Sequence, residues 1–136
     1  MADQVEFELV SPERLLLSAS VDMVVVPGAE GDFGVLPGHA PMISGMRTGV
    51  IVTYADGSVA RRVFVSGGFA EVTAERCTVL ADEAISFDDT DRNEAEARIN
   101  TARGQLDDAD KDGRDAAQAR LDVAEALLAA IDATAA

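Results

Sequence analysis

The spacing of apolar residues changes once along this chain of 136 residues, and the change falls near Phe87. Before it, apolar and polar residues alternate, most clearly over residues 4–9, which read QVEFEL. Such a period of two is typical of strands with one buried face. After Phe87, glycine and proline almost vanish, and apolar residues recur every three or four positions. The sequence therefore predicts a β domain followed by a helical segment.

Several short apolar runs in the first part of the chain are candidate strands. Asp56-Gly57 is expected to form a tight hairpin turn because its central positions need positive φ, and Gly67-Gly68 is expected to do the same for the next pair. Many short strands at this spacing predict an antiparallel β-sandwich or flattened barrel, which we place at residues 3–86. The candidate strands are residues 5–9, 15–20, 21–26, 49–54, 58–65, 69–73 and 77–81.

Two alanine-rich seams predict an antiparallel two-helix hairpin over residues 90–133. Asp110–Arg114 separates the seams, and Gly113 is expected to take the left-handed conformation that ends a helix. Asp89, Thr90 or Asp91 is expected to cap the first helix. Alternation of alanine with leucine or isoleucine buries little apolar area per turn, so the hairpin should be weakly held. The seams are Ala95, Ile99, Ala102, Leu106 and Ala109, then Ala117, Leu121, Ala124, Leu128 and Ile131.

Charge restricts the partners that the chain can take. It holds 25 Asp and Glu against 11 Lys and Arg, a net charge of -14, of which residues 82–136 carry -9. Phosphate backbones and anionic lipid heads would repel such a polyanion, so neither nucleic acid nor direct lipid insertion is expected. Residues 1–6 are acidic, unlike a leader peptide, and no apolar run approaches the roughly 18 residues that span a bilayer. Membrane association should therefore go through another protein.

Residues suited to catalysis or metal binding are few. Cys77 is the only cysteine and lies in a strand-like run, which favours a buried thiol in a reducing compartment. A small hydrolase would pair His39, the only histidine, with Ser44, Ser66 or Cys77, but the spacing brings none of them together. One His and one Cys give few soft ligands, so no metal is expected. No glycine-rich phosphate loop precedes the sole lysine, Lys111, and no cofactor is expected.

One acidic run leaves a second function open. Asp108–Gly113 matches the first six positions of a calcium-binding EF-hand loop, in which alternate acids and a glycine wrap the ion. The eighth position is Asp115 instead of an apolar residue, and the twelfth is Ala119 instead of a bidentate glutamate. The alternatives are thus a calcium sensor and a solvated acidic turn.

Three prolines stiffen the segment Pro27–Ser44, which reads PGAEGDFGVLPGHAPMIS. We interpret it as a turn-rich surface loop, and a stiff loop loses little entropy when it docks. Together with Ser66–Val72, which reads SGGFAEV, and with the alanine-rich tail, it resembles the epsilon subunit of the bacterial proton-translocating ATP synthase, the delta subunit of mitochondria. This resemblance spans nearly the whole chain.

The resemblance implies a non-catalytic subunit of the central stalk that couples proton translocation to ATP synthesis. Its partners would be the gamma subunit and the membrane-embedded c-ring, with the alpha and beta subunits reached through the C-terminal helices. The protein would be peripheral, on the cytoplasmic face of the bacterial inner membrane. By the same resemblance, the c-ring would contact Glu30, Gly31 and Asp32, and gamma would contact His39, Pro41 and Met42.

Some epsilon subunits bind ATP through an Ile/Leu-Asp-x-x-Arg-Ala signature at the start of the first tail helix. Asp89 and Arg92 keep its spacing, whereas Asp88 and Asn93 replace the aliphatic residue and the alanine. The additional carboxylates would repel a triphosphate, which makes this a degenerate nucleotide site. In many members the tail extends into the catalytic head through basic residues and blocks hydrolysis. An acidic tail predicts feeble inhibition, with the hairpin mostly folded.

Overall fold

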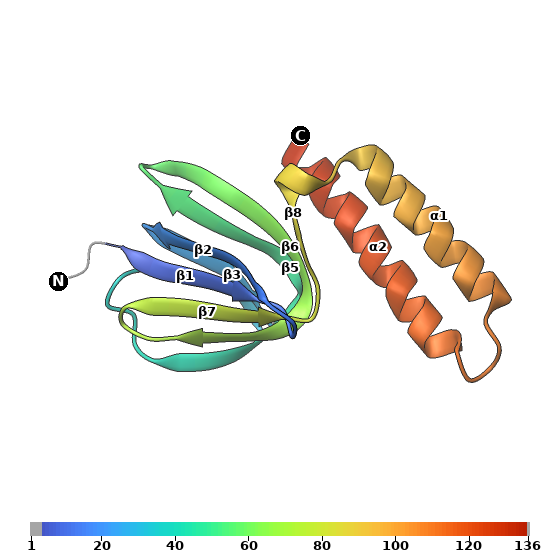
Figure 1. Ribbon diagram of the computed structural model, residues 1–136, viewed down its shortest axis with the longest axis horizontal. Helices are drawn as coiled ribbons and strands as arrows, with labels where there is room; N and C mark the ends of the chain where they lie inside the picture. The colour runs from blue at the N-terminus through green and yellow to red at the C-terminus, as the bar shows by residue number, and fades with distance from the viewer. Residues whose placement is uncertain (1–3, 136) are drawn as a thin grey trace. The chain divides into compact units, whose positions relative to one another are not determined.

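The computed structural model describes residues 4–135, which divide between Ser86 and Phe87 into two compact units (Figure 1). The first unit is built of strands and the second of helices, so the predicted order of the two structural types is confirmed. The first domain was predicted to start at residue 3, and the absence of a leader was inferred from residues 1–6. Residues 1–3 lie outside the described part of the chain.

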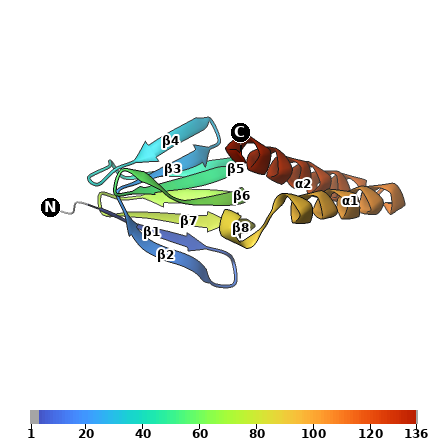
Figure 2. The same cartoon turned by 90° about the horizontal axis from the view of Figure 1, so that it is seen from above.

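Strands of the first unit join in one eight-stranded sheet that closes into a sandwich (Figures 1 and 2). Their order is β2-β1-β7-β6-β5-β3-β4, and β8 pairs with β6. All described pairs are antiparallel except β1 with β7, which run parallel, so the expectation of a wholly antiparallel sheet is corrected there. The strands are β1 Val5–Val10, β2 Leu15–Val21, β3 Met23–Gly28, β4 Gly31–Val35, β5 Met42–Ala55, β6 Ser58–Val72, β7 Arg76–Ala81 and β8 Ala84–Ser86.

Two long strands form the centre of this sheet, and the predicted Asp56-Gly57 turn joins them. Asp56 has φ 55° and Gly57 has φ 80°, the positive values that a tight hairpin turn requires. The strands β5 and β6 contain 14 and 15 residues. Residues 63–65 of β6 pair with β8, and residues 68–72 pair with β7. The long strand β6 therefore pairs with two further strands besides β5.

The second predicted turn, at Gly67-Gly68, is wrong. Both glycines have φ 119° but lie within β6, which runs without reversal through the segments predicted as separate strands, 58–65 and 69–73. A Cβ atom on Gly68 would lie 1.9 Å from the carbonyl oxygen of Leu80 on β7. Glycine is needed there for the close approach of two strands, as well as for the backbone conformation.

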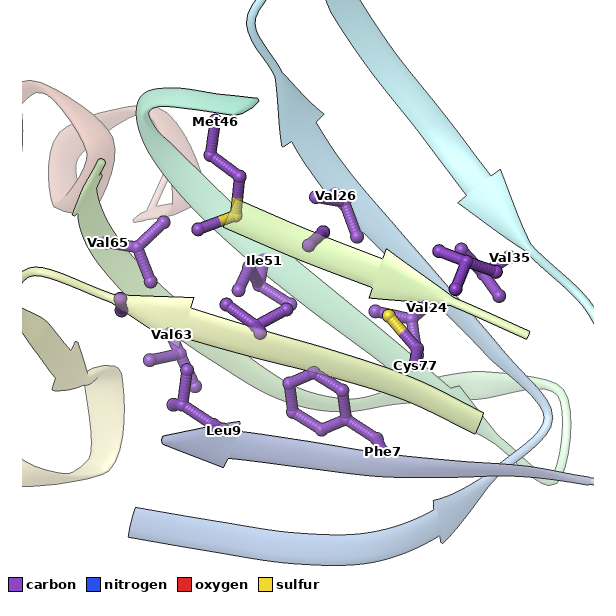
Figure 3. Close-up of a cluster of buried hydrophobic side chains, with 14 of the residues drawn as sticks. Phe7, Leu9, Val24, Val26, Val35, Met46, Ile51, Val63, Val65 and Cys77 are labelled. Atoms are coloured by element: carbon purple, nitrogen blue, oxygen red, sulfur yellow. The ribbon is translucent and has the colours of Figure 1, made fainter. Parts of the chain in front are cut away.

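Alternate side chains of the strands fill one hydrophobic core. Phe7 and Leu9 of β1 point into it beside Cys77 of β7, and all three are at most 2% exposed (Figure 3). The period-two pattern of residues 5–9 thus reports the buried face as predicted. Further members are Val24 and Val26 from β3, Val35 from β4, Ile51 from β5, and Val63 and Val65 from β6.

Pro27–Ser44 contains more regular structure than the predicted loop. Its first residues end β3, Ala29 and Glu30 form a turn, and β4 pairs back onto β3 from Gly28↔Gly31 to Val24↔Val35. Only residues 36–41, hereafter the 36–41 loop, connect β4 with β5 outside the strands. The glycines that suggested a loop are tolerated because β4 is an edge strand of the sheet.

The second unit contains α1, Arg92–Asp108, and α2, Arg114–Ala135, preceded by a short 3₁₀ turn, Phe87–Asp89. Asp91 caps α1 by accepting a 2.8 Å hydrogen bond at Oδ1 from the Glu94 amide, so one of the three predicted caps is confirmed. Buried seam residues meet as the spacing predicts. Ile99 and Ala102 of α1 pack with Leu121 and Ala124 of α2, and Leu106 and Leu128 are partly buried against them. Ala95 and Ala117 are buried too, whereas the buried Leu127 was not in the predicted seam.

Gly113 immediately precedes α2 and does not end α1. It has no positive φ, and its carbonyl accepts the amide of Ala117, the first intrahelical bond of α2. Its own amide donates to Oδ1 of Asp110 at 2.8 Å. The expectation of a left-handed glycine is therefore wrong, because α1 ends at Ala109 in an extended conformation with φ -70° and ψ 139°.

Candidate functional site

The tip of the β3–β4 hairpin is exposed and acidic. Ala29 and Glu30 form its turn, and Gly31, with φ 144°, starts the returning strand. Glu30, Gly31 and Asp32 are all exposed, so the three residues predicted for the c-ring lie together at one accessible place. Their position at the end of an edge hairpin leaves them free to meet a partner.

Arg47, which sequence reasoning missed, lies across the base of this tip. Its Nη1 donates to the carbonyl oxygen of Gly28 at 2.6 Å, and its Nη2 forms an ion pair with the carboxylate of Asp32. Asp32 is therefore neutralised, and Glu30 is the acid of the tip without a charged partner among the described residues. No local pattern could identify the pair, because 15 positions separate its members.

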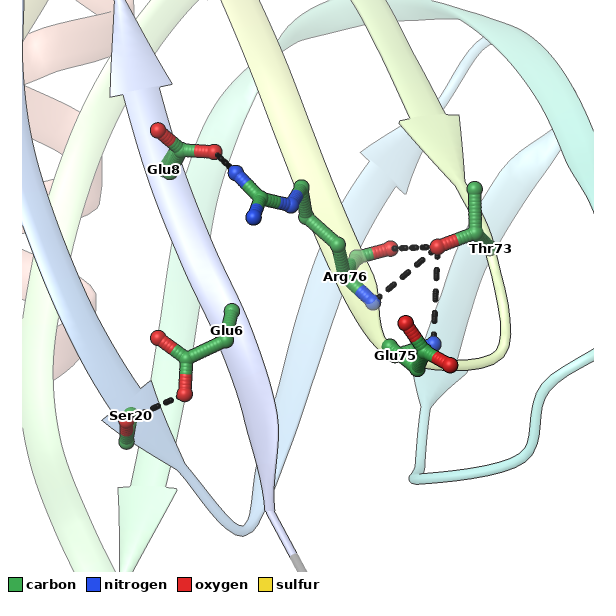
Figure 4. A network of polar contacts seen from close by, with 6 residues as sticks. All are labelled: Glu6, Glu8, Ser20, Thr73, Glu75 and Arg76. Carbon is green, nitrogen blue, oxygen red and sulfur yellow. Dashed lines mark hydrogen bonds and ion pairs between the residues drawn. The ribbon is translucent and has the colours of Figure 1, made fainter. Parts of the chain in front are cut away.

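One backbone bond to the neighbouring β6–β7 turn and one within the loop hold the 36–41 loop. The Gly38 amide donates to the Ala74 carbonyl at 2.7 Å, and the His39 amide donates to Leu36 at 3.1 Å. The β6–β7 turn is itself stiffened by Thr73, because its Oγ1 accepts hydrogen bonds from the backbone amides of Glu75 and Arg76 (Figure 4). The predicted stiffness of the loop thus has a structural basis besides its prolines.

The loop residues predicted for gamma differ in their accessibility. Pro41 is exposed, His39 is half-buried with Nδ1 2.7 Å from the Ala40 carbonyl oxygen, and Met42 packs against the sandwich core. Ile43, the next residue, points outward because side chains alternate along a strand. The outward residue at the start of β5 is therefore Ile43, which the sequence pattern did not single out.

Ile43 is part of an apolar patch on the outer face of the sheet, which we define as Ile43, Phe69 and Leu80. Their exposed fractions are 71%, 60% and 50%. Phe69 pairs directly with Leu80, and its other partner, Gly45, lies two residues beyond Ile43 on the same face. Large apolar side chains that cluster on a surface are typical of protein interfaces. This patch and the 36–41 loop adjoin at the start of β5.

His39 and its candidate partners do not form a catalytic group. Described hydrogen bonds join His39 to Leu36 and Ala40, and none joins it to a serine. The Cys77 thiol is buried in the core, and this burial raises its pKa from 9.0 to about 12. Such a thiol remains protonated and is a poor nucleophile.

Asp89 and Arg92, the degenerate nucleotide signature, lie at the start of the helical unit. Asp89 ends the 3₁₀ turn, and Arg92 is the first residue of α1. The Arg92 guanidinium donates to both carboxylate oxygens of Asp132 on α2 and forms an ion pair with Glu96. The hydrogen bond to Asp132, together with the charges of Asp132 and Glu96, raises the pKa of Arg92. The N–H groups of the Arg92 guanidinium are therefore engaged by carboxylates of the hairpin itself.

The acidic run at Asp108–Gly113 is not assembled as an ion site. Within residues 4–135, no three His, Cys, Asp or Glu side chains are grouped so that they could hold a metal ion. Asp110 uses Oδ1 to accept the Gly113 amide, which is the role of a turn residue. Among the described helices, none is long and apolar enough to cross a membrane.

A match to a protein-family model defines the class of this protein. Residues 4–87 match the family model described as "ATP synthase, Delta/Epsilon chain, beta-sandwich domain". The protein is thus one of the delta/epsilon chains, whose sandwich is the fold described above.

Full-length relatives then identify the family. An ATP synthase epsilon chain of Rhodospirillum rubrum is 56% identical over 132 residues, covering 96% of this chain and 98% of the relative. That of Paramagnetospirillum magneticum is also 56% identical, covering 96% and 99%. The chain belongs to the ATP synthase epsilon chain family. The predicted family is therefore confirmed, and so is the prediction of a non-catalytic subunit.

Solved structures extend the likeness of the fold to mitochondrial complexes. A chain of the Euglena gracilis mitochondrial ATP synthase, in its OSCP/F1/c-ring structure, aligns with a TM-score of 0.76 and 23% identity, covering 96% of this chain and 82% of that one. A chain from the Tetrahymena thermophila mitochondrial ATP synthase central stalk and c-ring aligns with a TM-score of 0.61 and 17% identity, covering 91% and 96%. At these identities the comparison shows a shared fold.

Proposed function

We propose that this epsilon chain is a passive coupling element of the central stalk, contacting gamma through the apolar patch and the 36–41 loop and the c-ring through the β3–β4 turn. Both structural neighbours come from mitochondrial ATP synthase assemblies that include the c-ring. The observation that carries the proposal is the arrangement of two unlike surfaces on one rigid sheet. One is acidic and the other apolar, and β4, of five residues, separates the β3–β4 turn from the 36–41 loop.

Rigidity suits an element that has to transmit torque. The strand β4 spans about 15 Å at the usual rise per residue, and its backbone is paired along β3. Both connections at its ends are fixed by hydrogen bonds, namely Arg47 to Gly28 and Gly38 to Ala74. Force applied at one surface therefore reaches the other without bending a flexible linker.

The gamma contact is tested by charging the patch. Phe69→Glu places a carboxylate at the centre of the proposed interface, where burial without a partner is costly. We expect this variant to lose co-purification with gamma at a one-to-one ratio. Leu15→Glu is the matched control, because Leu15 is 54% exposed on β2 and lies outside the patch. Equal retention of both variants by gamma would refute the assignment of the patch.

The c-ring contact is tested at the tip. An acidic tip fits basic groups on the polar loops of the ring, so Glu30→Gln should weaken binding of the chain to purified ring, most strongly at low salt. Glu13→Gln removes the same charge from the exposed β1–β2 connection and should bind normally. If Glu30→Gln binds the ring with full affinity and an unchanged salt dependence, the c-ring does not contact this surface.

The helical hairpin is proposed to regulate hydrolysis weakly and to remain folded without nucleotide. Arg92 has its donors on Asp132 and Glu96, and residues 82–136 carry a net charge of -9, which gives little attraction to an acidic catalytic subunit. In the reconstituted complex, deletion of residues 88–136 should change ATP hydrolysis little. A large rise in hydrolysis on deletion would show strong inhibition by this tail.

The same proposal places the protein at the cytoplasmic face of the bacterial inner membrane, as a peripheral subunit. The relatives named above are bacterial epsilon chains, and the described helices include none that could cross the bilayer. Association would then depend on the complex, and washing that releases gamma from membranes should release this chain with it. Retention on membranes freed of gamma and of the c-ring would contradict this placement.

A further inference from the structure

Arg47 lies where the ladder between β3 and β5 is irregular. Pairing is regular up to Val25↔Val52, shifts register, and resumes only at Gly28↔Met46. Across this gap two residues of β3 face five of β5, so few backbone pairs join the end of the hairpin to β5. Beyond the gap, the Ala29 amide also donates to the Gly45 carbonyl at 2.9 Å.

The Arg47 side chain adds to the few backbone bonds beyond the gap. It reaches the Gly28 carbonyl at the end of β3 and the Asp32 carboxylate near the start of β4, one contact on each strand of the hairpin. A planar guanidinium holds two acceptors in a fixed relative orientation, which the single ammonium of lysine does not. Both strands flanking Glu30 are thus fastened to β5 by one side chain.

We propose that Arg47 is a positioning residue that orients the β3–β4 turn, so that the Glu30 carboxylate is presented to basic polar loops of the c-ring. This inference rests on the proposed function of the turn. Arg47 and Asp32 are 46% and 60% exposed, and an ion pair so exposed contributes little to the stability of the fold. The ion pair instead orders the turn before docking, and this order lowers the entropy that is lost on binding.

A role of Arg47 through its charge and a role through positioning the turn predict opposite changes in ring binding when the side chain is removed. Arg47→Met uncovers the Asp32 carboxylate and makes the tip more acidic, so attraction alone would tighten its binding to a basic partner. Loss of the clamp lets the turn move and weakens binding. The sign of the change therefore distinguishes a positioning residue from a charge that merely lies nearby.

The experiment measures the affinity of the full chain for purified c-ring in lipid nanodiscs. We expect Arg47→Met to bind about five- to tenfold more weakly, and Arg47→Lys, which keeps the charge, to recover only part of the loss. Arg14→Met is the control for charge, since Arg14 lies in the exposed β1–β2 connection. Hydrogen exchange of the free chain supplies a second readout, in which amides of residues 29–31 should exchange faster in Arg47→Met alone.

The outcomes separate this inference from the function on which it rests. Weaker ring binding by Glu30→Gln, combined with unchanged or tighter binding by Arg47→Met, overturns the role of Arg47 and leaves the ring surface intact. Normal binding by Glu30→Gln overturns the ring surface and, with it, the role of Arg47. Should Arg47→Met fold poorly, Asp32→Asn breaks the clamp from the other side. Slow exchange and full affinity in that variant would also overturn the proposal.

Discussion

Nε of Arg92, at the start of α1, donates a 2.9 Å hydrogen bond to Oδ1 of Asp132, which lies 40 positions later near the end of α2. The contacts with Asp132 fasten the open end of the hairpin, opposite its turn, and the ion pair of Arg92 with Glu96 lies within α1. Near the turn, Arg120 donates to Gln105 at 3.0 Å and closes the other end. Polar contacts at both ends therefore support a seam made mainly of alanine.

Removal of the Arg92 contacts should loosen the open end of the hairpin. We expect Arg92→Met to accelerate hydrogen exchange in the first turn of α1 and the last turn of α2, because these ends would open locally. The effect should shrink in about 1 M salt, where the Debye length is about 3 Å. Arg103→Met, at an exposed position of the same helix, is the matched control and should leave the exchange unchanged. Equal effects of both variants would mean that the pair does not hold the end.

Two glycines should respond in opposite ways to alanine. At Gly68 the added Cβ would meet the Leu80 carbonyl oxygen and the backbone φ is 119°, so Gly68→Ala should lower the free energy of unfolding by about 3 kcal/mol or more. At Gly104, inside α1, no atom lies within 4 Å of the added Cβ. Gly104→Ala should raise the free energy of unfolding by roughly 0.5–1 kcal/mol. Urea unfolding measures both, and a tolerated Gly68→Ala would contradict the close approach of β6 and β7.

These glycines also show how far the sequence could predict the fold. Asp56-Gly57 was predicted as a turn because both of these adjacent residues readily adopt the positive φ that the turn requires. Gly67-Gly68 gives the same local signal, but its cause is the distant Leu80 backbone, which no local pattern contains. The parallel pairing of β1 with β7 is likewise a contact between segments far apart in the chain. Periodicity predicts buried faces, and long-range pairing has to be observed.

The candidate site was likewise predicted only in part from the sequence. Glu30, Gly31 and Asp32 were found from a family resemblance, and their exposure at a hairpin tip agrees with a surface role. The Arg47 clamp was missed because an ion pair across strands depends on register, and the register of β3 with β5 is irregular at that point. The helical seam was found because its spacing is local, although α2 buries Leu127 and leaves Leu128 only partly buried.

Thr53 is a polar residue that is buried in the sandwich. It is 1% exposed, and Oγ1 makes no hydrogen bond with any described residue. Thr53→Val keeps the branched shape and removes the unsatisfied group, so it should raise the free energy of unfolding by about 1 kcal/mol. Thr48→Val, at a half-buried position of the same strand, is the control and should change it by less than about 0.5 kcal/mol. A loss of stability in Thr53→Val would show that the hydroxyl is satisfied in solution.

Cys77 should make stability depend on pH in the alkaline range. Burial raises the pKa of its thiol from 9.0 to about 12, so the native thiol keeps its proton where the unfolded one has lost it. The stabilisation is complete below pH 9.0 and is lost as the pH rises toward 12, at about 1.4 kcal/mol per pH unit. Cys77→Ala lacks this dependence but loses packing at every pH. In urea titrations the stability difference between wild type and variant should be constant below pH 9.0 and shrink above it. A difference that stays constant up to about pH 11 would show that the thiol ionises equally in both states.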